Sequence, residues 1–248
     1  MAKTTRKNEL RGKHGATPEG AKHTETSRGA FLFDLDGTLV DSELDLAHSI
    51  NAMLRYLNAS ELPVEVVASY VGDGAPMLVR RALGDPQDEA YVQAALEYFL
   101  LYYREHKLDH TYVYPGVLDT LHAISQRSNL KMAVLTNKPV NPSRAICDGL
   151  GLSGYMSQIY GGNSFATKKP DPHGARVLLD EHSVLPMEAI MIGDSQNDVL
   201  TANNAGMFSI GVNYGFSPES LQIHPPDALI DHPEELLELL EIGRGAKR

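Results

Sequence analysis

Short apolar runs alternate with amphipathic segments over most of the chain. The apolar runs predict buried strands at 30–33, 131–135, 158–160, 189–192, 208–212 and 228–230. Between the later runs, apolar residues at three-to-four spacing predict helices at 117–125, 142–150, 172–181 and 197–205. Such alternation is typical of an α/β fold, so we expect a doubly wound parallel sheet with helices on both faces.

The segment from Ser42 to Tyr114 breaks this alternation. It shows no convincing strand and instead predicts helices at about 43–57, 63–70, 75–83 and 88–105. A parallel crossover needs only about a dozen residues, and the helix at 117–125 already supplies them, so about seventy residues are surplus. We therefore expect an all-helical cap domain at 44–114, inserted into a core formed by 29–43 and 115–248.

Two carboxylates, Asp34 and Asp36, follow the first predicted strand, with Gly37 and Thr38 directly after them. Ionised carboxylates this close repel each other and are costly to desolvate, and a divalent cation such as Mg²⁺ would remove both problems. Asp34 could then act as a nucleophile and Asp36 as a general acid, as in phosphoryl transfer through an aspartyl phosphate. The alternative is an ordinary acidic turn with Gly37 at its tip.

Polar residues also follow two later strands. Thr136 and Asn137 end the strand at 131–135, where a hydroxyl and backbone N–H groups can hold a phosphate oxygen, although such a pair commonly forms only a turn or a helix cap. Asp194 ends the strand at 189–192 and can face the same cation as Asp34 and Asp36. Asp198 could support the metal site or orient a lysine, or simply be a favourable acid at a helix N-terminus.

A phosphate-binding centre with several carboxylates also needs a cation besides Mg²⁺. Lys168 and Lys169 stand in a loop before a predicted helix and could provide it, although two loop lysines are more often surface charges.

These motifs together resemble a known family. FDLDGTLVDS, at 33–42, is similar to the first motif of the phosphatase branch of the haloacid dehalogenase superfamily, whose members have a Rossmann-like core. TNKP at 136–139, KKPDP at 168–172 and GDSQND at 193–198 resemble the later motifs, in the expected order. The resemblance covers about residues 30–242 and is closest to phosphoglycolate-phosphatase-like members.

The resemblance implies a role for each motif. It implies Asp34 as nucleophile, Asp36 as acid and base, and Thr136 as phosphate ligand assisted by Asn137. It favours Lys169 over Lys168, because the family's lysine usually stands directly before the proline. We expect Asp34, Asp36 and Asp194 to bind Mg²⁺, with Gly37, Thr38 and Asp198 in supporting positions.

The expected function is therefore a Mg²⁺-dependent phosphomonoester hydrolase acting on a small phosphorylated metabolite, with 2-phosphoglycolate as the best candidate. In the predicted cap, the turn at 71–74 resembles a glycine turn of phosphoglycolate phosphatases, and the helix after it contains Arg80 and Arg81. Either arginine could bind the substrate carboxylate, or both could be solvated charges.

Other functions stay open. The alternatives are a phosphosugar mutase of the β-phosphoglucomutase type, another small-metabolite or nucleotide phosphatase, and a catalytically silent binding protein. A dehalogenase is disfavoured because that branch lacks the second aspartate, which stands here as Asp36. A receiver module is disfavoured because its acid pair precedes the acceptor strand and it has no inserted cap.

The composition of the chain argues against several classes of binding partner. The formal net charge is −10, while residues 1–28 carry seven basic residues against three glutamates, so the rest of the chain is near −14. An acidic body argues against broad nucleic-acid binding. No apolar run approaches the roughly 20 residues of a membrane span, and the single cysteine, Cys147, excludes an internal disulfide. We expect a cytoplasmic enzyme, monomeric or homodimeric, with 1–28 as a disordered arm.

Overall fold

The computed structural model describes residues 29–239 of the chain. The predicted arm at 1–28 lies outside the described residues, so that expectation stays a prediction. Within 29–239, no helix is both long and apolar enough to cross a membrane.

Six parallel strands form the central sheet, in the order β5-β4-β1-β6-β7-β8. Their bounds are β1 (Gly29–Phe33), β4 (Leu130–Leu135), β5 (Gln158–Tyr160), β6 (Ala189–Gly193), β7 (Phe208–Val212) and β8 (Ala228–Ile230). The predicted parallel sheet is confirmed, with each strand within one residue of its expected bounds. The strands that follow β1 extend first to one side of it and then to the other, and α/β proteins bind ligands at the carboxyl ends of strands at such a reversal.

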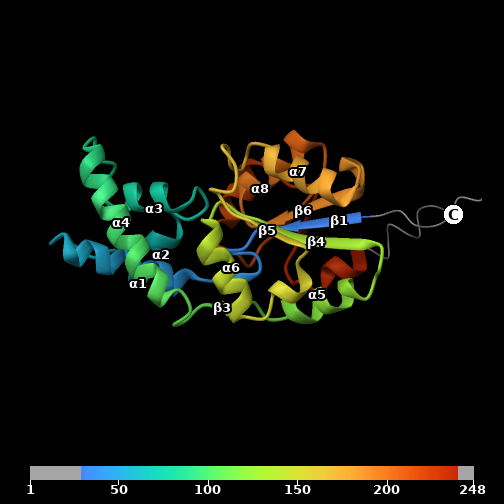
Figure 1. Ribbon diagram of the computed structural model, residues 1–248, viewed down its shortest axis with the longest axis horizontal. Helices are drawn as coiled ribbons and strands as arrows, with labels where there is room; N and C mark the ends of the chain where they lie inside the picture. Colours follow the sequence, from blue (N-terminus) through green and yellow to red (C-terminus); the bar gives the residue numbers. More distant parts are fainter. Residues whose placement is uncertain (1–28, 240–248) are drawn as a thin grey trace, which may run out of the picture.

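Helices cover both faces of the sheet (Figure 1). Helices α5 (Val117–Ser125) and α6 (Val140–Gly149) lie on one face, and α7 (His173–His182) and α8 (Gln196–Ala205) lie on the other. Successive residues of a strand point to opposite faces, so β1 contributes to two separate cores. Phe31 and Phe33 pack in one hydrophobic cluster, and Ala30 and Leu32 pack in the other.

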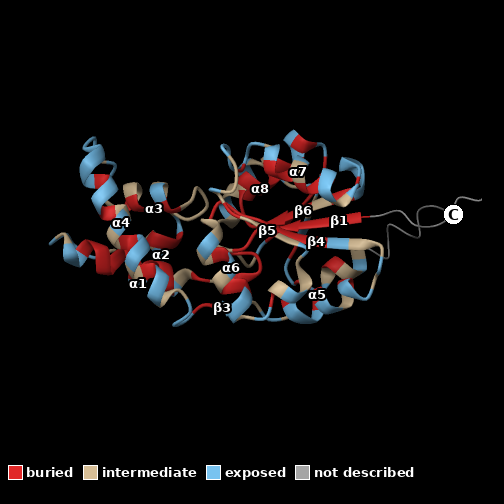
Figure 2. Ribbon diagram, viewed as in Figure 1, coloured by how far each residue is buried: buried red, intermediate tan, exposed pale blue. Residues whose placement is uncertain are grey.

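Four further helices stand apart from the sheet, on the left of Figure 1. They are α1 (Glu43–Tyr56), α2 (Val64–Ala68), α3 (Ala75–Ala82) and α4 (Glu89–His106). We call residues 43–106 the helical lobe. Buried positions lie on the facing sides of its helices (Figure 2), where Ile50 and Met53 of α1 and Phe99 of α4 belong to one cluster. The helices of the lobe therefore pack on one another through apolar side chains, which belong to the same hydrophobic cluster as Phe31 and Phe33 of β1.

Two short strands join the chain entering the lobe to the chain leaving it. β2 (Val40–Asp41) pairs antiparallel with β3 (Tyr112–Val113). Neither of these short strands was predicted from the sequence, because two residues are too few to show a periodic pattern. The short helix α9 (Pro218–Ile223) was also not predicted.

A buried carboxylate reinforces this junction. Asp45, on the first turn of α1, is 1% exposed. Its oxygens accept hydrogen bonds from the backbone N–H groups of His110 at 3.0 Å and Thr111 at 2.8 Å, and from the Thr111 hydroxyl at 2.7 Å. These bonds fix the point where the chain leaves the lobe against the point where it enters.

We predict that Asp45→Ala lowers the free energy of unfolding by about 3 kcal/mol, since a buried donor left without a partner costs about 1–3 kcal/mol. Asp45→Asn keeps one acceptor oxygen and should lose less. Urea denaturation followed by circular dichroism measures both, with Glu43→Ala in the same turn as the control. Equal, small losses in all three variants would show that the junction does not depend on Asp45.

Candidate active site

Three carboxylates meet at the carboxyl edge of the sheet. Asp34 follows β1, Asp194 follows the adjacent parallel strand β6, and Asp198 lies in the first turn of α8. All three are buried, and they offer oxygen atoms that lie within 4.8 Å of one another. The pairing of β1 with β6 therefore brings together acids that are 160 residues apart in the sequence.

Two glycines permit this close approach. Gly37 has a φ of 76°, and a Cβ there would lie 2.3 Å from the Asp194 Oδ2 atom. A Cβ at Gly193 would lie 2.0 Å from the Asp198 Cγ atom. Any larger residue at either position would displace a carboxylate of the cluster.

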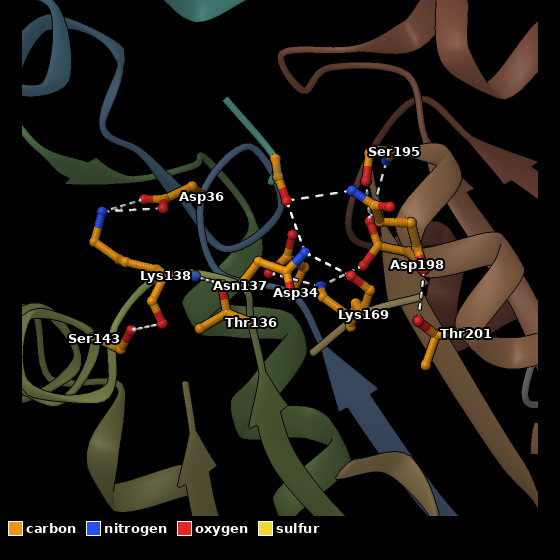
Figure 3. Close-up of polar contacts among 12 residues, drawn as sticks. Asp34, Asp36, Thr136, Asn137, Lys138, Ser143, Lys169, Ser195, Asp198 and Thr201 are labelled. Carbon is orange, nitrogen blue, oxygen red and sulfur yellow. Dashed lines mark hydrogen bonds and ion pairs between the residues drawn. The ribbon is translucent and has the colours of Figure 1, made fainter. Parts of the chain in front are cut away.

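One lysine is paired with the cluster. The buried Lys169 ammonium lies 3.0 Å from Asp34 Oδ1 and 2.5 Å from Asp198 Oδ1 (Figure 3). The other Asp198 oxygen accepts hydrogen bonds from the Ser195 backbone N–H at 3.1 Å and its hydroxyl at 2.8 Å. Asp198 thus caps α8 and orients Lys169 at the same time.

The negative charge in this cluster exceeds the positive charge. Burial raises the pKa of Asp34 to about 6, with Lys169 opposing and Asp198 adding to the shift. Burial, and then the neighbouring Asp198 and Asp34, hold the pKa of Asp194 well above its usual range. Burial lowers the pKa of Lys169, but the carboxylates outweigh it, so the net shift is upward. Three buried oxygen donors with one ammonium fit a hard divalent cation.

The structure does not bring Asp36, predicted from the sequence as a metal ligand, into the cluster. Its carboxylate accepts hydrogen bonds from the Lys138 ammonium at 2.9 and 3.0 Å and from the Ser42 hydroxyl at 2.6 Å. Figure 3 shows Asp36 and Lys138 on the opposite side of Asp34 from Lys169. The third carboxylate of the cluster is Asp198, which we expected only in a supporting position.

The other predicted core residues lie at the same edge. Thr136 and Asn137 follow β4, and both are buried. The Asn137 amide donates to the Lys169 carbonyl at 3.0 Å and to the Gly72 carbonyl of the helical lobe at 2.9 Å. Lys168 does not reach the carboxylates and donates to the Asp73 carbonyl at 2.6 Å.

Arg80 and Arg81, considered as ligands of a substrate carboxylate, are both bound to groups of the helical lobe. Arg80 donates to the Pro86 carbonyl at 2.9 Å and to Glu89 at 2.6 Å, and Arg81 donates to the Tyr70 carbonyl at 2.9 Å and pairs with Asp73. Neither lines the cavity at the sheet edge. Both guanidinium groups are bound within the lobe, which leaves the carboxylate role expected of them without support.

A cavity lies between the sheet edge and the helical lobe. Asp34, Asp36, Thr136 and Lys138 line it from the sheet, and Val71, Leu78, Phe99 and Tyr103 line it from the lobe. Sequence reasoning assigned no role to Lys138 or Tyr103. A lysine directly after the strand-end pair Thr136 and Asn137 was a usable signal for Lys138, whereas Tyr103 is one of several tyrosines on α4.

This chain belongs to the haloacid dehalogenase-like hydrolase family, whose model matches residues 31–212. That match spans all four predicted motifs and the helical lobe.

Several relatives carry one name. The chain is 40% identical over 197 residues to "Phosphoglycolate phosphatase" of Rhodospirillum rubrum, covering 77% of this chain and 81% of that protein. It is 36% identical over 218 residues to the protein of the same name from Photobacterium profundum, covering 85% of this chain and 95% of that one. A crystal structure of a "predicted phosphoglycolate phosphatase" from Haemophilus somnus superposes with a TM-score of 0.80 at 31% identity, over 87% of this chain and 99% of that chain.

We predict that Asp194→Asn stabilises the protein in chelator at pH 7, because it removes one of three buried acids whose mutual repulsion Lys169 offsets only in part. The melting temperature should rise by about 2–4 °C for each kcal/mol gained. Raising the pH from 5 to 7 in chelator should destabilise the unsubstituted protein, because Asp34, whose pKa is about 6, ionises in the folded state across this range. A lower melting temperature for Asp194→Asn in chelator would contradict this account of the cluster.

Proposed function

We propose that this protein is a Mg²⁺-dependent phosphomonoester hydrolase that acts through an aspartyl phosphate on Asp34, with 2-phosphoglycolate as its substrate. The observation that carries the proposal is the arrangement around Asp34. A buried carboxylate at the end of β1 has an ammonium and two further carboxylates on one side and a second aspartate, Asp36, on the other. The names of the relatives support the choice of substrate.

Asp34 acts as the nucleophile, and Asp36 acts as the general acid and base. An Asp34 oxygen forms a bond to phosphorus while the bond from phosphorus to the ester oxygen breaks, and Asp36 gives its proton to the departing oxygen. Water then attacks phosphorus and returns a proton to Asp36, and the bond between phosphorus and Asp34 breaks. Lys138 and Ser42 keep Asp36 on the side of Asp34 opposite Lys169, where the leaving group would stand.

Asp34, Asp194 and Asp198 are the residues that would hold or support Mg²⁺. When bound, Mg²⁺ would offset the buried negative charge and polarise the phosphoryl group. Lys169 adds a fixed positive charge against the phosphoryl oxygens, and the Thr136 hydroxyl lies on the cavity wall as a further donor.

We also propose that the helical lobe acts as a cap over the site. Its loop at 71–74 contacts the core through Asn137 and Asn197, which both donate to the Gly72 carbonyl, at 2.9 and 3.2 Å. A cap that excludes water from the first step favours transfer of the phosphoryl group to Asp34.

We predict that Asp34→Asn reduces turnover to the uncatalysed background, because an amide cannot replace the nucleophile. Asp36→Asn should slow turnover by roughly 10²–10⁴-fold, the usual contribution of a positioned acid and base. Release of inorganic phosphate from 2-phosphoglycolate measures both, with Asp180→Asn on the exposed face of α7 as the control. Near-normal turnover by Asp34→Asn would refute the covalent mechanism.

We predict that a chelator abolishes activity and that Mg²⁺ restores it. Ca²⁺ should substitute poorly, because it relaxes the octahedral geometry that Mg²⁺ imposes. Undiminished turnover in chelator would exclude the carboxylate cluster as a required metal site. Formation of an isomeric sugar phosphate, in place of inorganic phosphate, would favour a mutase.

A further inference from the structure

A buried ammonium and a buried hydroxyl lie together on the cavity wall, outside the carboxylate cluster. Lys138 follows β4, and Tyr103 lies on α4 of the helical lobe. The Lys138 Nζ atom is 4.6 Å from the centroid of the Tyr103 ring. Both residues line the same cavity as Asp34 and Thr136, so they face the space where a substrate would lie.

The Tyr103 hydroxyl is buried and lacks a well-formed hydrogen bond to the described residues. The residue is 3% exposed, its hydroxyl makes no hydrogen bond of good geometry within residues 29–239, and its nearest charged neighbour is the Lys138 ammonium. Burial raises its pKa to about 12, so near neutral pH it is a protonated donor. A buried polar group without a partner is costly, and such groups in native proteins often have a functional reason.

Lys138 is charged, and its only carboxylate partner among the described residues is Asp36. Burial lowers the pKa of Lys138, but the Asp36 carboxylate outweighs burial and the net shift is upward. Lys138 is thus a buried, fixed positive charge on the cavity wall, and a substrate anion that enters the cavity can pair with it.

The rest of this wall offers little to an anion. The lobe contributes mainly apolar side chains there, among them Val71, Leu78 and Phe99. Among the described residues that line the cavity, Lys138 is the only cation.

We infer that Lys138 and Tyr103 form a carboxylate subsite for the leaving-group end of the substrate, an inference that rests on the proposed function. The Lys138 ammonium supplies a positive charge from the core, and the Tyr103 hydroxyl supplies a hydrogen bond from the helical lobe. The site therefore selects short phosphomonoesters that carry a carboxylate close to the ester oxygen, over neutral or cationic esters of the same length. The subsite is complete only when the helical lobe lies against the core.

The test compares 2-phosphoglycolate with 2-hydroxyethyl phosphate, which has the same chain length and no carboxylate. Tyr103→Phe removes one hydroxyl and should lower the ratio of the two kcat/KM values about tenfold, mainly through KM for 2-phosphoglycolate. Lys138→Met should lower that ratio about 10- to 100-fold, since a hydrogen bond to a charged group is worth more than a neutral one. Tyr102→Phe is the matched control, because Tyr102 stacks on His106 and does not line the cavity.

A binding measurement that needs no turnover accompanies the kinetics. In the Asp34→Asn background, calorimetry should show 2-phosphoglycolate binding about tenfold more weakly when Tyr103→Phe is added, with no such change for 2-hydroxyethyl phosphate. Equal losses on both esters, or an unchanged ratio in both cavity variants, would overturn the subsite while leaving the hydrolase intact. Failure of the unsubstituted protein to hydrolyse any phosphomonoester would instead refute the proposed function, and the binding comparison would still decide the subsite.

Discussion

Mutual repulsion among three buried carboxylates is the constraint on which the rest of the site depends. Asp34, Asp194 and Asp198 are buried close together, and within residues 29–239 Lys169 is the one ammonium paired to them. The order of the sheet places the first two on adjacent strands, and Gly37 and Gly193 leave room for the carboxylates. Such a cluster is unfavourable for folding by itself, and the proposed cation would offset its charge, which is typical of sites selected for function.

The same elements hold the helical lobe against the core. Asn197, one residue before Asp198, donates to the Asp73 carboxylate at 2.9 Å, and Lys168, one residue before Lys169, donates to the Asp73 carbonyl. Arg81 pairs with the same aspartate. The loop at 71–74 is thus held by residues adjacent in sequence to those of the carboxylate cluster. The loops that carry Lys169 and Asp198 also contact Asp73 of the helical lobe. We therefore expect a substitution at Asp73 to alter the positions of Lys169 and Asp198.

The sequence predicted the sheet and the strand-end residues because both follow from local patterns. Apolar runs mark buried strands, and polar residues directly after them must lie at the same edge. The direction of the Asp36 side chain could not be predicted, because it depends on Lys138, which is 102 residues away. The environment of Arg80 likewise depends on Glu89 and Pro86 across a turn. Pairing of β2 with β3 was missed because two-residue strands carry no periodicity. These three features depend on contacts between residues that are separated in sequence, which a local sequence pattern does not show.

The central claim is that Asp34 becomes covalently phosphorylated, and trapping the acyl phosphate tests it most directly. Enzyme quenched during turnover of 2-phosphoglycolate is reduced with borohydride, which converts a phosphorylated aspartate to homoserine, and peptide mass spectrometry locates the change. The account predicts conversion at position 34 alone, dependent on Mg²⁺ and on substrate. Conversion at Asp36, Asp194 or Asp198, or no conversion at position 34 with an intermediate shown kinetically to accumulate, would contradict it.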